Sequence, residues 1–158
     1  MFSCDNIQLD HYESHPLYGE SMILIIPNKW LKEEDEAKLA YLSPLEAFQH
    51  VPFIMLRKGN NNREKVEQLM LKYNIKIKPI LETDQNISAC SMACSGIGAT
   101  IVSDRIAHTL CGGQKVHIYP LPDPEMKRIN YINCPKSSRF LVHEFVRIAQ
   151  RSLSKYKD

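Results

Sequence analysis

Short apolar runs alternate along the chain with stretches in which apolar residues recur at helical spacing. The runs, bounded by turn residues, predict strands at 21–26, 53–56, 75–81, 99–102, 116–119 and 129–133. The periodic stretches predict helices that begin at Ser43, Arg63, about Asp84, Ser103, and Ser137 or Ser138. Because strands and helices alternate through the middle of the chain, the pattern predicts an α/β fold with a largely parallel sheet.

Several local signals fix where these elements start and stop. Ser43-Pro44-Leu45-Glu46 has the residues of a capping box. Gly59 to Asn62 predict a turn and a helix cap, and Asn74 a helix end. The charged stretch KEEDEAK predicts a solvated loop or a short exposed helix. In the last helix the predicted apolar stripe is Phe140, Leu141, Phe145, Ile148 and Ala149.

Composition narrows the class of protein. The chain has 158 residues, 44% hydrophobic and 24% charged, with a formal net charge of +2. This is the composition of a modest globular domain, without the charge expected of a nucleic-acid or membrane surface. No apolar run approaches the roughly 18 residues of a membrane span. The first fifteen residues lack the pattern of a signal peptide, so a cytoplasmic location is predicted.

The residues that most often bind metals show no ligand spacing in the sequence. Five cysteines, an odd number, in a chain without a signal peptide argue against a disulfide framework. Cys90 and Cys94 are four residues apart, which places them on one helix face, and we interpret them as buried thiols that act as small apolar residues. The six histidines are interpreted as surface or structural residues. We therefore predict neither a metal site nor a cofactor.

The clearest candidate site precedes the helix predicted from about Asp84 to Ser95. In a doubly wound sheet, ligands bind beyond the carboxyl ends of strands, where helix N-termini point into the crevice. The free N–H groups of Thr83, Asp84, Gln85 and Asn86 are then positioned to hold a polar or anionic ligand. The alternative is that Thr83 or Asp84 only caps the helix. If Asp84 faces the ligand, it favours a neutral or cationic one.

A second candidate lies in the turn before the preceding helix. Asn61, Asn62 and Arg63 form a similar donor-rich turn. The alternative is a solvated loop. Ser103 and Asp104 lie at another predicted strand end, and we interpret them mainly as a helix cap.

Four stretches, taken in order, resemble the effector-binding domain of LysR-type transcriptional regulators. They are GESMILIIPNKW, SPLEAFQHVPFIMLRKGNNNREKVEQLMLKYNI, ILETDQNISACSMACSGIGATIVSD and VHIYPLPDPEMKRINYINCPKSSRFLVHEFVRIAQ. The resemblance implies the fold of type 2 periplasmic binding proteins, in which two α/β lobes hold a ligand in a cleft. It implies one complete lobe at 28–115 and part of the other at 1–27 and 116–158.

The resemblance also implies a function. The chain is expected to sense a small-molecule effector and to oligomerise, and to act on DNA only through a winged helix that these residues do not contain. The incomplete first lobe suggests a truncated chain that covers its uncovered sheet edge and apolar face by self-association. The alternative is a solute-binding protein of the same fold. We predict no enzyme, because no nucleophile stands beside a base and no carboxylates cluster.

Overall fold

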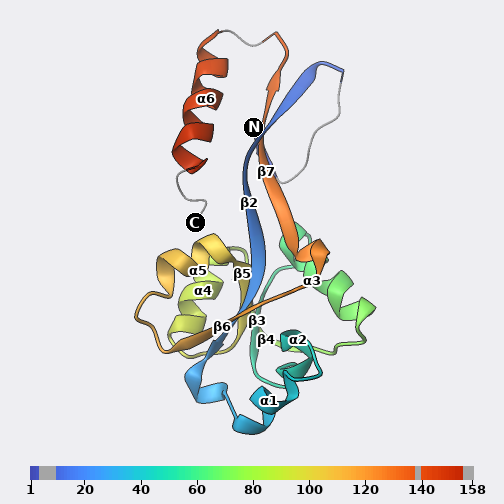
Figure 1. Ribbon diagram of the computed structural model, residues 1–158. Helices are drawn as coiled ribbons and strands as arrows, with labels where there is room; N and C mark the ends of the chain where they lie inside the picture. Colours follow the sequence, from blue (N-terminus) through green and yellow to red (C-terminus); the bar gives the residue numbers. More distant parts are fainter. Residues whose placement is uncertain (4–9, 138–139, 155–158) are drawn as a thin grey trace. The chain divides into compact units, whose positions relative to one another are not determined.

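The computed structural model describes residues 1–3, 10–137 and 140–154, which belong to two compact units (Figure 1). Unit 1 is formed by Met1–Glu20 and Lys127–Asp158, and unit 2 by Ser21–Met126. The long strand β2 (Tyr12–Pro27) contributes its first part to unit 1 and its second part to unit 2.

Unit 2 is built on parallel and antiparallel strand pairs. The second part of β2 pairs antiparallel with β5 (Thr100–Ser103) and with β6 (Val116–Pro120). Strand β3 (Phe53–Leu56) pairs in parallel with β4 (Pro79–Thr83), and a parallel bridge joins Phe53 to Ala99, directly before β5. Strands β3, β4 and β5 therefore run in the same direction, and their carboxyl ends lie at the same edge.

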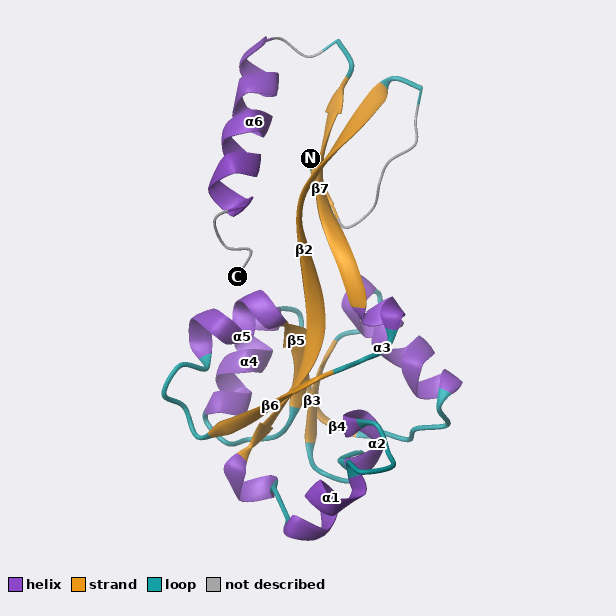
Figure 2. Cartoon of the chain, in the orientation of Figure 1, coloured by secondary structure: helices purple, strands orange, loops and turns teal. Residues whose placement is uncertain are grey.

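The helices of unit 2 alternate with strands along the chain. They are η1 (Asn28–Trp30), α1 (Glu33–Lys38), α2 (Pro44–Ala47), α3 (Asn61–Lys72), α4 (Asn86–Cys94), α5 (Asp104–Leu110) and η2 (Pro124–Met126) (Figure 2). The capping box of α2 is confirmed: Ser43 Oγ accepts from Glu46 N at 3.4 Å, and Ser43 N donates to Glu46 Oε2 at 3.0 Å. Asn74 has a φ of 52°, a left-handed conformation that ends α3 as predicted.

The core of unit 2 has two parts because alternate residues of β2 face opposite sides. Leu24 and Ile26 pack in one cluster with Phe48, Phe53, Val66 and Leu69. Ile23 and Ile25 pack in the other with Ala89, Cys90, Ala93 and Ala107, which come from α4 and α5. The small side chains of Ala89, Cys90 and Ala93 let α4 approach the strands closely. A Cβ on Gly98 would lie 2.6 Å from the Pro52 carbonyl oxygen, so only glycine fits there.

Four sequence predictions in unit 2 need correction. The sheet is not largely parallel, because β2 pairs antiparallel with both β5 and β6. The strand predicted at 75–81 is observed at Pro79–Thr83. Ile75 is not part of it, because Ile75 N donates to Met70 O at 2.8 Å and the Ile75 side chain is buried in the core. The helix predicted from Asp84 begins at Asn86. The charged stretch does form a short helix, but Asp35 is buried, with Lys38 Nζ at 2.7 Å and His50 Nε2 at 3.0 Å.

Unit 1 contains β1 (Phe2–Ser3), the first part of β2, β7 (Lys127–Pro135) and α6 (Phe140–Ser154). Its strand order is β1-β7-β2. The predicted strands at 21–26 and 129–133 are too short, because their extensions carry polar residues that the apolar pattern does not mark. One such extension holds Glu20, a buried carboxylate that accepts from Arg128 Nε and, at 2.9 Å, from Asn130 Nδ2.

Four of the five residues in the apolar stripe predicted for α6 do not face the core of unit 1, whereas Ala149 does. The buried apolar residues there are Leu17, Ile132 and Val146, with Ala149 and Leu153 of α6 packed against them. Phe140 and Leu141 are 77% and 75% exposed, and Phe145 and Ile148 are each 53% exposed. The helix itself is therefore confirmed, whereas the buried side is the one that carries Val146. Ser138, one of the two predicted starts, lies outside the described residues.

Candidate functional site

Three helices of unit 2 begin at the edge where β3, β4 and β5 end. Helix α3 starts after the loop that follows β3, α4 starts three residues after β4, and α5 follows β5 directly. This arrangement places helix N-termini beyond the carboxyl ends of parallel strands, where open α/β sheets bind ligands. We call the surface formed by residues 57–63, 82–88 and 103–106 the polar edge.

The three N-termini at the polar edge differ in how they are capped. Asn60 Oδ1 accepts from Asn62 N at 2.9 Å and caps α3. Ser103 Oγ accepts from Ile106 N at 3.4 Å and caps α5, which confirms the interpretation of Ser103 as a cap. Gln85 is the N-cap residue of α4, and its side chain makes no capping hydrogen bond. Among these three helices, α4 is thus the one whose first-turn N–H groups have no side-chain acceptor from the cap residue.

The predicted polar run before α4 is divided between a strand and a helix cap. Thr83 is the last residue of β4, its carbonyl accepts from Arg57 N at 2.9 Å, and its hydroxyl oxygen accepts from Gln85 N at 3.4 Å. Asp84 is exposed and pairs with Arg57 Nη1 at 3.4 Å. The sequence predicts that the backbone N–H groups of Thr83 to Asn86 are all free to bind a ligand. In the structure the helix begins at Asn86, so the free N–H groups of its first turn begin there as well.

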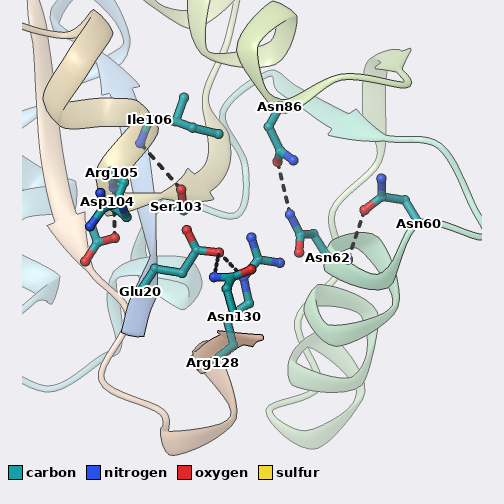
Figure 3. A network of polar contacts seen from close by, with 10 residues as sticks. All are labelled: Glu20, Asn60, Asn62, Asn86, Ser103, Asp104, Arg105, Ile106, Arg128 and Asn130. Carbon is teal, nitrogen blue, oxygen red and sulfur yellow. Dashed lines mark hydrogen bonds and ion pairs between the residues drawn. The ribbon is translucent and has the colours of Figure 1, made fainter. Parts of the chain in front are cut away.

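Asn62 and Asn86 connect the starts of α3 and α4. The Asn62 side-chain amide donates to Asn86 Oδ1 at 3.1 Å, as Figure 3 shows. Asn62 is buried, whereas Asn61, the first residue of α3, is exposed. The structure therefore brings one residue of each predicted site into direct contact and leaves Asn61 open to solvent.

Arg63 is held by groups of unit 2 itself. Its side chain is 6% exposed, and Nη1 donates to the Leu56 carbonyl at 2.8 Å and to Glu82 Oε1 at 3.0 Å. Its Nε donates to Glu67 Oε1 at 2.8 Å. Arg63 therefore links the first turns of α3 to the end of β3 and to β4, and the two carboxylates offset its charge.

A small pocket adjoins the polar edge. It is lined by Ile54, Met55, Leu56, Asn62, Arg63, Val66 and Ile101, and its volume of about 10 Å³ is that of a single water molecule. Ligand pockets of drug-sized molecules are typically about 300–1,000 Å³. What unit 2 offers to a ligand is therefore an open polar surface with one narrow recess beside Asn62 and Arg63.

Two residues of the polar edge were not identified from the sequence. Glu82 and Arg57 pair with Arg63 and Asp84, respectively. These pairs depend on the parallel register of β3 and β4, which places Met55 beside Glu82 and Leu56 beside Thr83. By contrast, Glu67 follows Arg63 by four residues, a spacing that does predict an ion pair on a helix.

Comparison with known proteins identifies similar domains. The family model described as LysR substrate binding domain matches residues 1–154. The regulatory domain of CcmR from Synechocystis PCC6803, solved in complex with 2-PG, is 16% identical with a TM-score of 0.71, and the alignment covers 96% of this chain and 72% of that one. The effector-binding domain of QuiR in complex with shikimate is 17% identical, with a TM-score of 0.64 and coverages of 94% and 69%.

A longer relative shows how much of a whole regulator the chain matches. Full-length CbnR, solved in complex with its target DNA, is 14% identical with a TM-score of 0.67, and the alignment covers 96% of this chain but 51% of that protein. No curated protein matches the sequence significantly. The described helices include none that is long and apolar enough to cross a membrane. These likenesses confirm the predicted α/β fold of the type 2 periplasmic-binding-protein class.

Proposed function

Because the chain belongs to the LysR substrate-binding domain family, we propose that it is the effector-sensing and oligomerisation domain of a bacterial, cytoplasmic transcription regulator. In this proposal residues 28–115 form a complete lobe, and 1–27 and 116–158 form part of the other. The effector changes how the domain packs, and so the geometry of a DNA-binding domain outside these 158 residues.

The observation that carries the proposed effector site is the start of α4. Its first-turn N–H groups lie at the polar edge without a capping side chain. The positive end of the helix dipole acts at the same place, and together they favour an anionic group. The QuiR domain named above was solved with shikimate, which is a carboxylate. We therefore propose that this chain binds a small organic acid, with its carboxylate at the start of α4.

The arginines Arg57 and Arg63 of the polar edge are neutralised by carboxylates, which favours a ligand with little net charge. Arg57 is paired with Asp84, and Arg63 with Glu67 and Glu82. Since both of these guanidinium groups are paired with carboxylates, we assign the binding of the effector's carboxylate to the N–H groups of α4. The side chains of Thr83, Gln85, Asn86 and Asn61 remain as polar contacts for the rest of the effector, and Asn62 and Arg63 hold the surface in place.

A matched pair of variants at Asn86 tests this site. Asn86→Ala removes the side chain but keeps the N–H, whereas Asn86→Pro removes both. Proline suits the first position of a helix, and Gln85, with φ −121° and ψ 129°, has the extended backbone that a residue before proline prefers. The variants are to be titrated by calorimetry with a panel of small carboxylic acids that includes shikimate.

We expect Asn86→Pro to bind the carboxylate at least roughly tenfold more weakly than Asn86→Ala, the loss typical of one hydrogen bond to a charged group. Asn61→Ala, at an exposed position of the same edge, is expected to change affinity less. Equal affinities of the proline and alanine variants would show that the N–H of α4 does not hold the ligand.

The proposed oligomerisation rests on the exposed side of α6. Phe140, Leu141, Phe145 and Ile148 are all more than half exposed, and contiguous apolar surface of this kind marks interaction sites. We propose that a second copy of the chain covers it. Sedimentation is expected to show a dimer or larger assembly that Phe140→Glu shifts toward the monomer, while a monomeric native chain would contradict the proposal.

A further inference from the structure

Unit 1 brings four potential metal ligands together from three elements. Glu13 and His15 lie on the first part of β2, Cys134 lies near the end of β7, and His143 lies in the first turns of α6. More than a hundred residues separate the two pairs along the chain, so sequence spacing could not reveal the cluster.

The distances from Glu13 to the other three residues fit the coordination shell of one zinc ion. From Glu13 Oε1, His15 Nε2 and His143 Nδ1 are each 3.4 Å away, and Cys134 Sγ is 3.5 Å away. The ligand atoms of Glu13, His15 and Cys134 all lie within 4.8 Å of one another. Tetrahedral zinc, with bonds of about 2.0–2.3 Å, places a nitrogen about 3.4 Å and a sulfur about 3.6 Å from a ligand oxygen.

His15 Nε2 gives a second, independent indication. This atom is buried and makes no hydrogen bond within the described part of the chain. At 3.4 Å the contact with Glu13 is longer than an ordinary hydrogen bond. A buried ring nitrogen without a partner is costly, and coordination to a metal would remove that cost.

We propose that Glu13, His15 and Cys134 form a mononuclear Zn²⁺ site, and that His143, which touches Glu13 but lies outside the group of mutually close ligand atoms, turns in as the fourth ligand. One carboxylate and one thiolate neutralise the two charges of the ion, and the two imidazoles bind as neutral ligands. The Cys134 thiol loses its proton to solvent when the Zn–S bond forms, and no electron is transferred. A mixed set of nitrogen, oxygen and sulfur suits Zn²⁺ better than Ca²⁺ or Mg²⁺, which prefer oxygen alone.

The site would strengthen the part of the molecule with the smallest core. It joins β2, β7 and α6, whose apolar contacts in unit 1 centre on Leu17, Ile132 and Val146. Because domains with little apolar burial commonly rely on a metal or a disulfide, a zinc ion here would fix α6 against the strands.

A second group of thiols, in unit 2, provides an internal comparison. Cys111 Sγ lies 3.7 Å from Cys90 Sγ and 3.6 Å from Cys94 Sγ. Cys90 and Cys111 lie in an apolar cluster, and burial raises the pKa of Cys90 to about 11 and raises that of Cys111 as well. Within the described residues no histidine or carboxylate joins this group. We therefore expect these thiols to stay protonated and not to bind the same ion.

Cobalt(II) replaces zinc and reports its ligands optically, so it is the probe of choice. The full chain, reduced and freed of metal, is titrated with CoCl₂, and its absorption is followed in the visible and near-ultraviolet. We expect one Co²⁺ per chain, a tetrahedral visible spectrum, and a sulfur-to-cobalt charge-transfer band. ZnCl₂ should displace the cobalt and abolish the spectrum.

The variants assign the site. Cys134→Ser should remove the charge-transfer band, and His143→Ala should weaken cobalt binding by more than the roughly tenfold typical of indirect contacts. Cys111→Ser and His108→Ala, at residues outside the cluster, should leave the spectrum unchanged. Since Cys134 is buried, far-ultraviolet circular dichroism checks that its variant folds, and His143→Ala carries the test if it does not.

Two results would overturn the proposal. One is a chain that binds no cobalt with a charge-transfer band at stoichiometric concentration. The other is a band that survives Cys134→Ser and disappears in Cys111→Ser, which would place the ion among the thiols of unit 2.

Discussion

The two units of the chain differ in how they are stabilised. Unit 2 has two apolar clusters of sixteen and ten buried residues, one on each side of its strands. Among its described residues, unit 1 has an apolar cluster of three buried residues and exposes the apolar face of α6 that contains Phe140. Since apolar burial is the main favourable term in folding, unit 1 has fewer apolar contacts of its own to stabilise it than unit 2 has.

The polar contacts of the two units also differ in where they lie. In unit 1, Glu20 is buried and binds Arg128 and Asn130, and Glu13 lies among His15, Cys134 and His143. In unit 2, Arg63 and Asn62 lie at the polar edge, where they hold the surface that carries the proposed effector site. The apolar residues of unit 2 thus support the proposed binding surface, while buried polar contacts accompany the small core of unit 1.

Replacing one buried isoleucine in each unit tests the difference in core size between the units. Of the effects predicted here, the loss in free energy of unfolding is expected to be the largest. Ile25 of unit 2 is completely buried, and Ile132 of unit 1 is 4% exposed. Replacement of a buried isoleucine by alanine typically costs about 2–5 kcal/mol. We expect Ile25→Ala to fall in the upper half of that range and Ile132→Ala in the lower half, because fewer buried neighbours surround Ile132.

Urea denaturation of the full chain measures both losses. Fluorescence of Trp30, the one tryptophan of the sequence, reports unit 2, and circular dichroism reports both units. Ile132→Ala should shift the circular dichroism transition more than the fluorescence transition. Equal losses in both variants by both signals would mean that the units are equally dependent on their cores.

We expect Asp123 to make a smaller, pH-dependent contribution to the stability of unit 2. Its carboxylate accepts from Lys72 Nζ at 2.8 Å, from Tyr73 Oη at 2.8 Å and from Glu125 N at 2.9 Å. These hydrogen bonds, with that from Lys72 first, lower the pKa of Asp123 to about 2. An unfolded aspartate titrates near about 3.9, so the stabilisation is complete above that pH and is lost as the pH falls toward 2.

The measurement is urea denaturation between pH 6 and pH 2 followed by Trp30 fluorescence. Asp123→Asn should be less stable than the native chain at pH 6 and should lose less stability on acidification. If both proteins lose stability in parallel between pH 4 and pH 2, Asp123 is not the group responsible.

Most of the elements could be predicted because their signals are local. The capping box at Ser43, the turn at Gly59 and the strand at 53–56 depend on adjacent residues, and the structure confirms them. The bounds of β4 and the start of α4 could not be predicted, because β4 extends as far as its pairing with β3, and α4 begins only after that pairing ends. The buried side of α6 also depends on which neighbour is present, and its apolar residues occur on more than one side.

The candidate site was predictable in position but not in detail. A polar run between a strand and a helix indicates a helix start at a strand end, and Thr83 to Asn86 lie there. The lack of a side-chain cap at Gln85 and the contact between Asn62 and Asn86 need the fold. The role of Arg63 is likewise set by Glu82, nineteen residues away, a distance at which sequence spacing carries no information.

The most direct test of the proposed function is to map an organic acid on the backbone amides of the full chain. The ¹⁵N-labelled protein is titrated with the tightest-binding carboxylic acid of the panel, and amide chemical shifts are followed. We expect the largest shift changes at the amides of Asn86, Ile87 and Ser88, with smaller ones at Asn61 and Asn62. Changes confined to other surfaces, with these amides unmoved at saturation, would contradict it.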